Sequence, residues 1–452
     1  MKIERIKAMT YTLFTGLYVV SLFIDASLIS YCLGCVACFI LFISFKGAAR
    51  TFQIISLIFL AFGIMIFLTS DLALSSFPLY LTSTALLLSL LYFLPFINHL
   101  MVVGGYDQEL KNLLQLRTRH LGQLYYRGSL ISYVLCLFVF FSAITIVQQV
   151  VRDVSENVDK RIMEKFSSQT ILRAFALANV WSPIEIFIAL TVTITGVQYF
   201  HLLPWALLFS ITLLMTDWLI GWFKYRTTRY EAPSHAPAIE YKRLWKKIGY
   251  LFVMLFLFII TAFGLQTLLG IDYFNAVILL IFPFTLFWAL SINQFSAFMR
   301  YNKKTWVGQV NGLQNFMLLF LSLGFFSDMF EQTALIDFMQ RPLLSMTEWP
   351  LLLFITIQLI SLIFSMIGVH PLVTISLMGT LIQPILTALS PLSLSIVLLT
   401  STLASDAAGT FNTTVTMMSE LTNRNPYRIT KWNLIFAIWF GTAGSLLAWL
   451  LL

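Results

Sequence analysis

Long apolar runs recur along almost the whole chain, and this pattern limits its fold more than any other feature. A helix that crosses a lipid bilayer needs about 20 mostly apolar residues. The sequence therefore predicts an all-α polytopic membrane protein with about 11 transmembrane helices. These stretches cover residues 9–24, 26–45, 52–70, 76–100, 128–149, 201–223, 248–270, 273–298, 312–327, 350–367 and 431–452.

The composition leaves no room for a sizeable soluble domain. The chain is 59% hydrophobic and only 11% charged, which is more apolar material than a single soluble core could bury. The segment "MKIERIKAMTYTLF" starts with positive charges but no small-residue cleavage site follows it, so we expect the first helix to be retained. The net charge of +8 does not predict nucleic-acid binding, because in a membrane protein the placement of Lys and Arg matters more than their sum.

The four cysteines do not predict a metal site. Cys32, Cys35 and Cys38 are three residues apart in an apolar run, with no His or carboxylate beside them, and Cys136 is isolated. Because free Cys behaves as a small hydrophobic residue, we expect all four to serve packing.

Two further apolar stretches, residues 166–198 and 370–406, are interrupted by the pairs Ser182-Pro183 and Ser390-Pro391. We interpret both as re-entrant or broken hairpins and place the N-terminus in the cytoplasm. With this topology 22 of the 28 basic residues face the cytoplasm, as the positive-inside rule predicts. The outer loops then hold Arg152, Lys160, Arg161, Lys165 and Arg341. A simple kink in an ordinary helix is the alternative for each Ser-Pro pair.

The same topology predicts two inverted repeats, because each half of the chain contains five crossings and one hairpin. The predicted parts are an extra N-terminal helix (1–25), a first repeat (26–223), a basic cytoplasmic linker (224–247) and a second repeat (248–452). The stretch "ANVWSPIEIFIALTVT" resembles "TALSPLSLSIVLLTST", while an alternative register pairs "LANVWSP" with "LASDAAG". Both registers stay open.

Interrupted helices at matching places in two inverted halves indicate the binding site of a transporter. A break frees amides and carbonyls that only protein or a watery cavity can satisfy within a membrane. The freed amides can bind an anion and the freed carbonyls a cation. The predicted substrate-binding residues at the two Ser-Pro pairs are Asn179, Ser182, Pro183, Ser390, Pro391 and Ser393.

A polar cluster in "TSTLASDAAGTFNTTV" predicts an ion-coupling site, because hydroxyl, amide and carboxylate oxygens suit a small cation and a carboxylate can also carry a proton. Asp406 is the leading coupling residue, although it could instead be a solvated carboxylate at the cytoplasmic boundary. The predicted coupling set is Asp406, Glu185, Ser405, Thr410, Asn412 and Thr413.

Arg173 is the only basic residue inside either interrupted stretch. It could bind a substrate anion through two hydrogen bonds, pair with Glu185, or reach the outer surface.

We expect His370 to be a cap or interface residue and Asp217 to lie at the membrane interface. The segment "QQVVRDVSENVDKRIMEKF" predicts an amphipathic surface helix.

No nucleotide-binding loop, metal-binding His pair or Ser-His-Asp arrangement is found in the sequence. We therefore expect no enzymatic activity and no cofactor.

The stretches "LRAFALANVWSPIEIFIALTVTITG", "GVHPLVTISLMG" and "LSPLSLSIVLLTS" look like the ion transporter superfamily of bacterial carboxylate and anion carriers. The resemblance implies inverted repeats, polar hairpin tips, an oxygen-lined Na⁺ or H⁺ site and a place in the bacterial cytoplasmic (inner) membrane. Two features depart from that family. The predicted first hairpin enters from outside, not from the cytoplasm, and the family's Ser-Asn-Thr tip is missing.

The sequence thus predicts a secondary active transporter, a symporter or antiporter, that couples a small anionic solute to Na⁺ or H⁺. The alternative is a flippase for a lipid-linked or amphiphilic substrate, which would use a lateral opening and a basic cavity. The expected partners are the lipid bilayer and the small-molecule substrate, and a homodimer stays open.

Overall fold

The computed structural model describes residues 2–106, 120–153, 158–228, 241–410 and 412–452. These residues are organised in helices, and no strand occurs among them. Nine of the described helices are long and apolar enough to cross a membrane, or ten if one bent pair counts as a single span. The predicted all-α class with many membrane-length helices is therefore confirmed.

The chain divides into two compact units. Unit 1 combines Met1–Gly104 with Leu257–Pro342, and unit 2 combines Gly105–Phe256 with Leu343–Leu452. The predicted parts follow the halves of the chain, whereas each compact unit takes one segment from each half. Half of the predicted linker 224–247, residues 229–240, lies outside the described residues.

Unit 1 is built from helices of both chain halves, with α3 packed against α14 and α4 against α12. Its helices are α1 (Lys2–Ser21), α2 (Ser27–Phe45), α3 (Arg50–Thr69), the 3-10 helix η1 (Leu74–Leu81), α4 (Ala85–Val103), α12 (Tyr273–Ser291), α13 (Phe295–Gly312) and α14 (Gln314–Phe330). Two helices, α11 (Tyr241–Leu269) and α15 (Ala334–Ser345), run from one unit into the other. The α2–η1 contact depends on Gly34, since a Cβ there would lie 2.2 Å from the Pro78 carbonyl oxygen.

Two predicted crossings in unit 1 have different limits in the structure. The stretch 273–298 ends as a helix at Ser291, because the chain turns at Asn293 with φ 57°. The stretch 312–327 belongs to a longer pair, α13 and α14, which is bent by 44°. The N-terminal helix α1, predicted as a crossing, is not among the nine.

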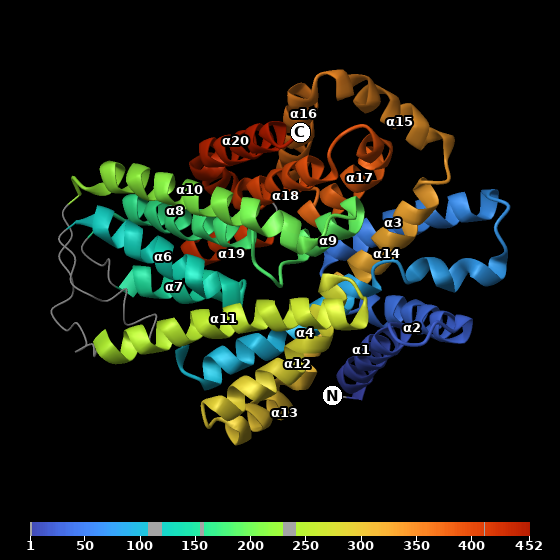
Figure 1. Cartoon of the computed structure of the whole chain (residues 1–452), viewed down its shortest axis with the longest axis horizontal. Coiled ribbons are helices and arrows are strands. Elements are labelled where there is room, and N and C mark those ends of the chain that lie inside the picture. Colours follow the sequence, from blue (N-terminus) through green and yellow to red (C-terminus); the bar gives the residue numbers. More distant parts are fainter. Residues whose placement is uncertain (1, 107–119, 154–157, 229–240, 411) are drawn as a thin grey trace. The chain divides into compact units, whose positions relative to one another are not determined.

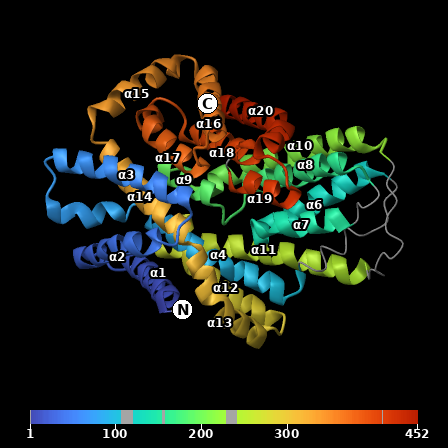
Figure 2. The same cartoon turned by 180° about the vertical axis from the view of Figure 1, so that it is seen from behind.

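Unit 2 contains the segments with the interrupted stretches. Its helices are α6 (Leu121–Val139), α7 (Ser142–Asp153), α8 (Lys160–Asn179), α9 (Ile186–Thr195), α10 (Tyr199–Tyr225), η2 (Met346–Glu348), α16 (Pro350–Ile367), α17 (Pro371–Ile382), η3 (Gln383–Thr387), α18 (Pro391–Ala408), α19 (Thr413–Thr422) and α20 (Pro426–Leu450). Figures 1 and 2 show α6, α8 and α10 side by side, and α18 packs against α8, α9, α16 and α20.

The predicted crossing at 128–149 is wrong, because the chain reverses near its middle. Phe140 has a positive φ of 50°, which ends α6, and α7 then packs back against both α6 and α8. Helices α6 and α7 therefore form a hairpin. The turn "VFFS" contains neither Gly nor Pro, so the apolar run does not reveal it.

This reversal also changes the side on which α8 begins. Near the start of α8, Gln169 Oε1 accepts a hydrogen bond of 2.5 Å from Lys224 at the end of α10, and Glu164 pairs with Arg424 at 2.6 Å just before α20. The basic residues Lys160, Arg161 and Lys165 thus share one end of unit 2 with Lys224. Placing them on the opposite side from Lys224 was wrong.

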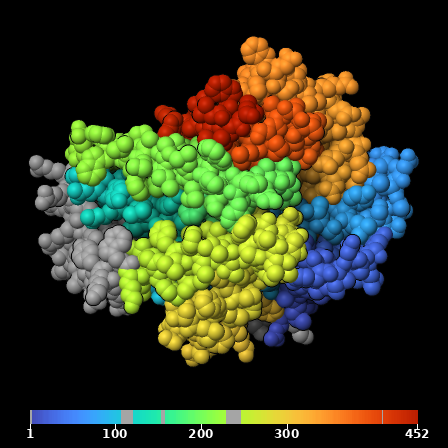
Figure 3. Space-filling view, in the orientation of Figure 1, coloured from blue at the N-terminus to red at the C-terminus, as the bar shows by residue number. Residues whose placement is uncertain are grey.

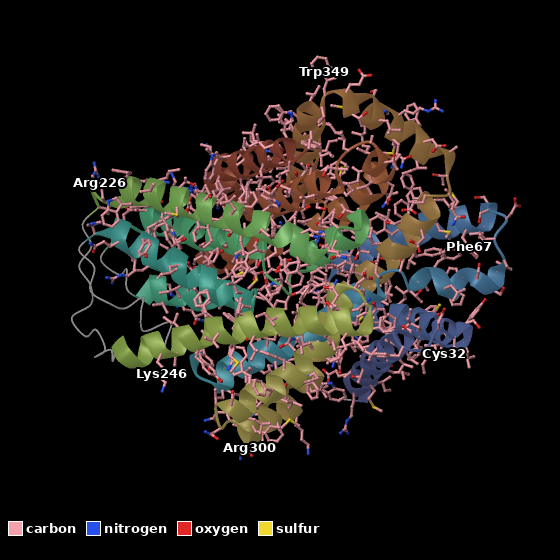
Figure 4. The ribbon with its side chains drawn as sticks, in the orientation of Figure 1. Cys32, Phe67, Arg226, Lys246, Arg300 and Trp349 are labelled. Atoms are coloured by element: carbon pink, nitrogen blue, oxygen red, sulfur yellow. The ribbon has the colours of Figure 1, made fainter. Side chains whose placement is uncertain are left out.

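Helices α8 and α9 together lead away from this basic end. Helix α10 begins four residues after α9 and needs 27 residues, about 40 Å, to return. The stretch 166–198 is therefore a broken helix and not a re-entrant hairpin. Figure 4 labels Arg226, which follows α10 at the basic end, and Trp349, which precedes α16 well away from it.

The second interrupted stretch, residues 370–406, also differs from the predicted re-entrant hairpin. A hairpin is formed by α16 and α17, which meet at Gly368 (φ 101°). The helix α18 then runs to a second break at 409–412, beyond the predicted stretch 370–406, and continues as α19.

Candidate functional site

The first break covers residues 180–185 between α8 and α9, and every residue in it is buried. Pro183 has no amide hydrogen to donate and so cannot continue the helix ladder. Glu185 caps α9, since its Oε1 accepts a hydrogen bond of 3.5 Å from the Phe187 amide. Sequence and structure thus agree that Ser182, Pro183 and Glu185 belong to a buried helix interruption.

The second break lies between α18 and α19, and its side chains satisfy the carbonyls that α18 leaves free. Asn412 Nδ2 donates to the Ser405 carbonyl at 3.0 Å, and Thr414 Oγ1 donates to the Asp406 carbonyl at 2.6 Å. Thr410 accepts a hydrogen bond from Thr430 at 3.2 Å. Thr413, half-buried, begins α19.

The two hairpin tips reach the two breaks. In the first hairpin Cys136 Sγ lies 3.1 Å from Asn179 Oδ1 at the end of α8. In the second, Ser365 lies beside Gly409, where an added Cβ would be 2.9 Å from the Ser365 Cβ. The Cys136 thiol is also near enough to the carboxyls of Glu185 and Asp406 to interact with them electrostatically.

These contacts bring the two breaks together in one buried region of unit 2, which we call the central cluster. Its members are Cys136, Asn179, Ser182, Glu185, Ser405, Asp406, Gly409 and Asn412, and each of them is buried. Four helices end here (α6, α8, α16 and α18) and four begin here (α7, α9, α17 and α19). The cluster therefore offers carbonyl oxygens and amide hydrogens as well as side chains.

Several polar atoms of the central cluster lack a hydrogen-bond partner in the described part of the chain. Asn179 Nδ2, Glu185 Oε2 and Asn412 Oδ1 are buried without a hydrogen bond to any described residue. Glu185 and Asp406 lie near enough to repel each other, and neither forms an ion pair within the described part of the chain. Buried polar groups are normally satisfied, so an ion, a proton or a polar ligand would complete this region.

Arg173 does not pair with Glu185. Its Nη1 lies 2.8 Å from the Asp217 carboxylate, and its Nε lies 3.3 Å from Asn433 Oδ1. The other Asp217 oxygen accepts a hydrogen bond of 2.7 Å from the Tyr125 hydroxyl. Asp217 is only 1% exposed, so it is buried between helices, and its predicted place at the membrane interface stays a prediction.

Three predicted substrate residues lie away from the central cluster. Ser390, Pro391 and Ser393 are at the start of α18, whose 18 residues place them about 27 Å from its other end. They border the end of α9 instead, where Ser395 and Thr195 hydrogen-bond at 2.8 Å. The Ser182-Pro183 and Ser390-Pro391 pairs therefore do not occupy equivalent places in the structure.

Two residues of the site were missed in the sequence, Cys136 in the central cluster and Ser365 beside it. Cys136 and Ser365 lie in apolar runs without a charged residue, so neither residue carried a signal. His370, predicted as a cap, does cap α17 through a hydrogen bond of 3.3 Å from the Leu372 amide to Nδ1.

A separate cavity of about 550 Å³ opens between α8, α10 and α20 at the basic end of unit 2. We call it the basic cavity. It is lined by Lys165, Gln169, Arg173, Asp217, Ile220, Lys224, Arg428, Lys431, Trp432, Ile435, Phe436 and Trp439. None of these residues belongs to the central cluster.

The described residues contain no group of three or more His, Cys, Asp or Glu side chains placed to hold a metal ion. No protein-family model and no curated protein matches the chain.

Proposed function

We propose that the chain is a secondary active transporter that couples a small anionic solute to Na⁺ or H⁺. The observation that carries the proposal is the central cluster. Two helix breaks and two hairpin tips meet there around two buried carboxyls that have no cationic partner among the described residues. Ion-coupled carriers build their sites from such discontinuous helices.

The lengths of the helices in unit 2 support an inverted repeat. Helices α6 to α10 have 19, 12, 20, 10 and 27 residues. Helices α16 to α20 have 18, 12, 18, 10 and 25 residues in the same order. Each series forms a hairpin, a broken helix and one long helix. This order favours the register that pairs "LANVWSP" with "LASDAAG" over the Ser-Pro register.

The reversal at Phe140 also supports a cytoplasmic basic end. When Arg152, Lys160, Arg161 and Lys165 join Lys224 on the inner side, the inner count rises from 22 to 26 of the 28 basic residues. The first hairpin, α6–α7, then enters from the cytoplasm. This removes one of the two departures from the ion transporter superfamily, while the missing Ser-Asn-Thr tip persists.

The central cluster suggests how cation and anion binding would be coupled. The carboxylates of Glu185 and Asp406 would repel an anionic solute, although the amides at the starts of α9 and α19 would attract one. A bound Na⁺ or proton would neutralise the carboxylates and so remove the repulsion. Each ligand would then raise the affinity for the other, which is the linkage that coupled transport needs.

The test uses purified protein in proteoliposomes with a panel of mono-, di- and tricarboxylates, with and without a Na⁺ or pH gradient. We expect gradient-driven uptake of at least one anion, its loss in Asp406→Asn and Glu185→Gln, and normal uptake in Asp25→Asn. Asp25 is an exposed carboxylate in unit 1 and serves as the matched control. Driven uptake that survives in both cluster variants would refute the assigned coupling site.

The basic cavity is the observation that favours the flippase alternative, because an anionic amphiphile would fit its cationic and aromatic walls. However, it opens at one end of unit 2 and shares no residue with the central cluster. The same vesicles, loaded with a fluorescent anionic phospholipid, separate the two functions. Accelerated lipid exchange between leaflets without solute uptake would favour the flippase.

A further inference from the structure

The basic cavity has a buried floor and an exposed mouth. Arg173 and Asp217 form the floor, 9% and 1% exposed, and their ion pair of 2.8 Å holds both side chains in place. Lys224, Arg428 and Lys431 are exposed at the mouth. The residues come from α8, α10 and α20, so the cavity is a cleft between helices and not a loop surface.

The charge of the basic cavity is strongly unbalanced. Five basic side chains line it against one carboxylate, and that carboxylate is already paired with Arg173. Four positive charges therefore converge on about 550 Å³ without an acidic partner in the lining. Such a field attracts a multiply charged or phosphate-like anion.

The walls of the basic cavity are apolar and extend to the lipid-facing surface. Ile220 on α10 is 54% exposed and Ile435 on α20 is 81% exposed, although both line the cavity. Trp432 and Trp439 also line the cavity, and the Arg428 guanidinium stacks 5.6 Å from the Trp432 ring centre. Figure 3 shows the surfaces of α10 (green) and α20 (dark red) adjoining on this unit.

We infer that the basic cavity binds the phosphate head group of an anionic phospholipid, with the lipid's acyl chains against the exposed apolar residues of α10 and α20. A free inorganic anion would use the cations but would leave Ile220 and Ile435 uncovered. A phospholipid uses both surfaces. Basic pockets between transmembrane helices on the cytoplasmic side are typical head-group sites, and Trp residues mark the membrane interface.

The inference does not depend on the proposed transport function, because the basic cavity and the central cluster have no residue in common. Lipid binding would tie α8, α10 and α20 together at the end of unit 2 where their basic residues repel one another. It would thereby stabilise the packing of the broken helix α8.

The test measures lipid binding to the delipidated full-length chain by native mass spectrometry. The probes are phosphatidylglycerol, phosphatidylcholine and inorganic phosphate. The triple variant Lys165→Gln, Arg428→Gln, Lys431→Gln removes three cations of the cavity. The matched control Lys160→Gln, Arg161→Gln, Arg226→Gln removes three cations of the same end that do not line it.

We expect the chain to bind phosphatidylglycerol more tightly than phosphatidylcholine, and the triple variant to lose roughly a hundredfold in affinity while the control keeps it. Ile435→Asn should weaken phosphatidylglycerol binding as well, which provides a second variant that leaves every charge in place. Equal affinity for both lipids, or an equal loss in the control, would overturn the inference. Inorganic phosphate that displaces phosphatidylglycerol at matched concentration would show that the site takes the anion and not the lipid.

Discussion

The guanidinium of Arg173 on α8 lies 2.8 Å from the carboxylate of Asp217 on α10, and both side chains are buried. The pair joins the first half of a broken helix to the long helix beside it. Tyr125 on α6 donates a second hydrogen bond to the same carboxylate. One ionic network thus connects three helices of unit 2.

Removing one charge of this network should cost more stability than removing both. Arg173→Met leaves the Asp217 carboxylate buried without its partner, so we expect the free energy of unfolding to fall by about 3–5 kcal/mol. The double variant Arg173→Met, Asp217→Asn should lose less, because Asn keeps an acceptor for Tyr125 and carries no charge. Denaturant titration in detergent micelles measures both. A double variant that is no more stable than Arg173→Met would contradict this coupling.

The sides of the membrane can be tested by labelling single cysteines. In a chain with Cys32, Cys35 and Cys38 replaced by Ala, we expect Lys160→Cys and Arg226→Cys to react with a membrane-impermeant maleimide from the same side, because α8 begins where α10 ends.

Trp349→Cys provides the control for the other side. Trp349 is 69% exposed and precedes α16 at the far end of unit 2. It should react only from the side opposite to Lys160→Cys. If Lys160→Cys instead reacts together with Trp349→Cys, the topology predicted from the sequence, with residues 128–149 as one crossing, is right.

The sequence revealed the helix breaks wherever they contain polar or helix-breaking residues. Pro183 and Glu185 are costly in lipid, so the first break could be predicted, and Asp406 with Asn412 indicated the second region. The predicted limits of the second interrupted stretch differ from those in the structure. The reason is that Ser390-Pro391, which starts α18, resembles a helix break in the sequence. The sequence alone does not distinguish a proline at the first position of a helix from a proline inside a helix.

The first hairpin turn could not be predicted from the sequence, because the residues around Phe140 are as apolar as the helices beside them. The second turn does contain Gly368 and Pro371, but Ser390-Pro391 was interpreted as the break instead. Hydropathy gives the length of an apolar segment, whereas the direction of the chain depends on backbone angles such as the positive φ of Phe140. One missed turn reversed the side assigned to Arg152, Lys160, Arg161 and Lys165. The partner of Arg173 could not be predicted either, because Asp217 lies 44 residues away in the chain.

Substitutions of Phe140 distinguish a turn from a straight helix. With φ 50° at this position, Phe140→Gly should be tolerated, because Gly adopts positive φ without strain. Phe140→Pro should abolish folding, because proline fixes φ near −65°. In a continuous helix Gly would cost about 1 kcal/mol relative to Ala. The thermal midpoints of Phe140→Gly and Phe140→Ala distinguish the turn from the continuous helix. A Gly variant less stable than the Ala variant would contradict the hairpin.

The contact between α18 and α20 should be sensitive to one added methyl group. A Cβ at Gly444 would lie 2.1 Å from Thr400 Oγ1 and 2.5 Å from Thr400 Cβ, so the helices would have to separate. We expect Gly444→Ala to lower the free energy of unfolding by about 1–3 kcal/mol, as overpacking usually does. Gly249→Ala is the matched control, because its Cβ meets nothing within 4 Å and Ala favours the helix. The companion change Thr400→Gly should restore part of the loss. If Gly444→Ala is as stable as Gly249→Ala, α18 and α20 do not approach as closely as the structure shows.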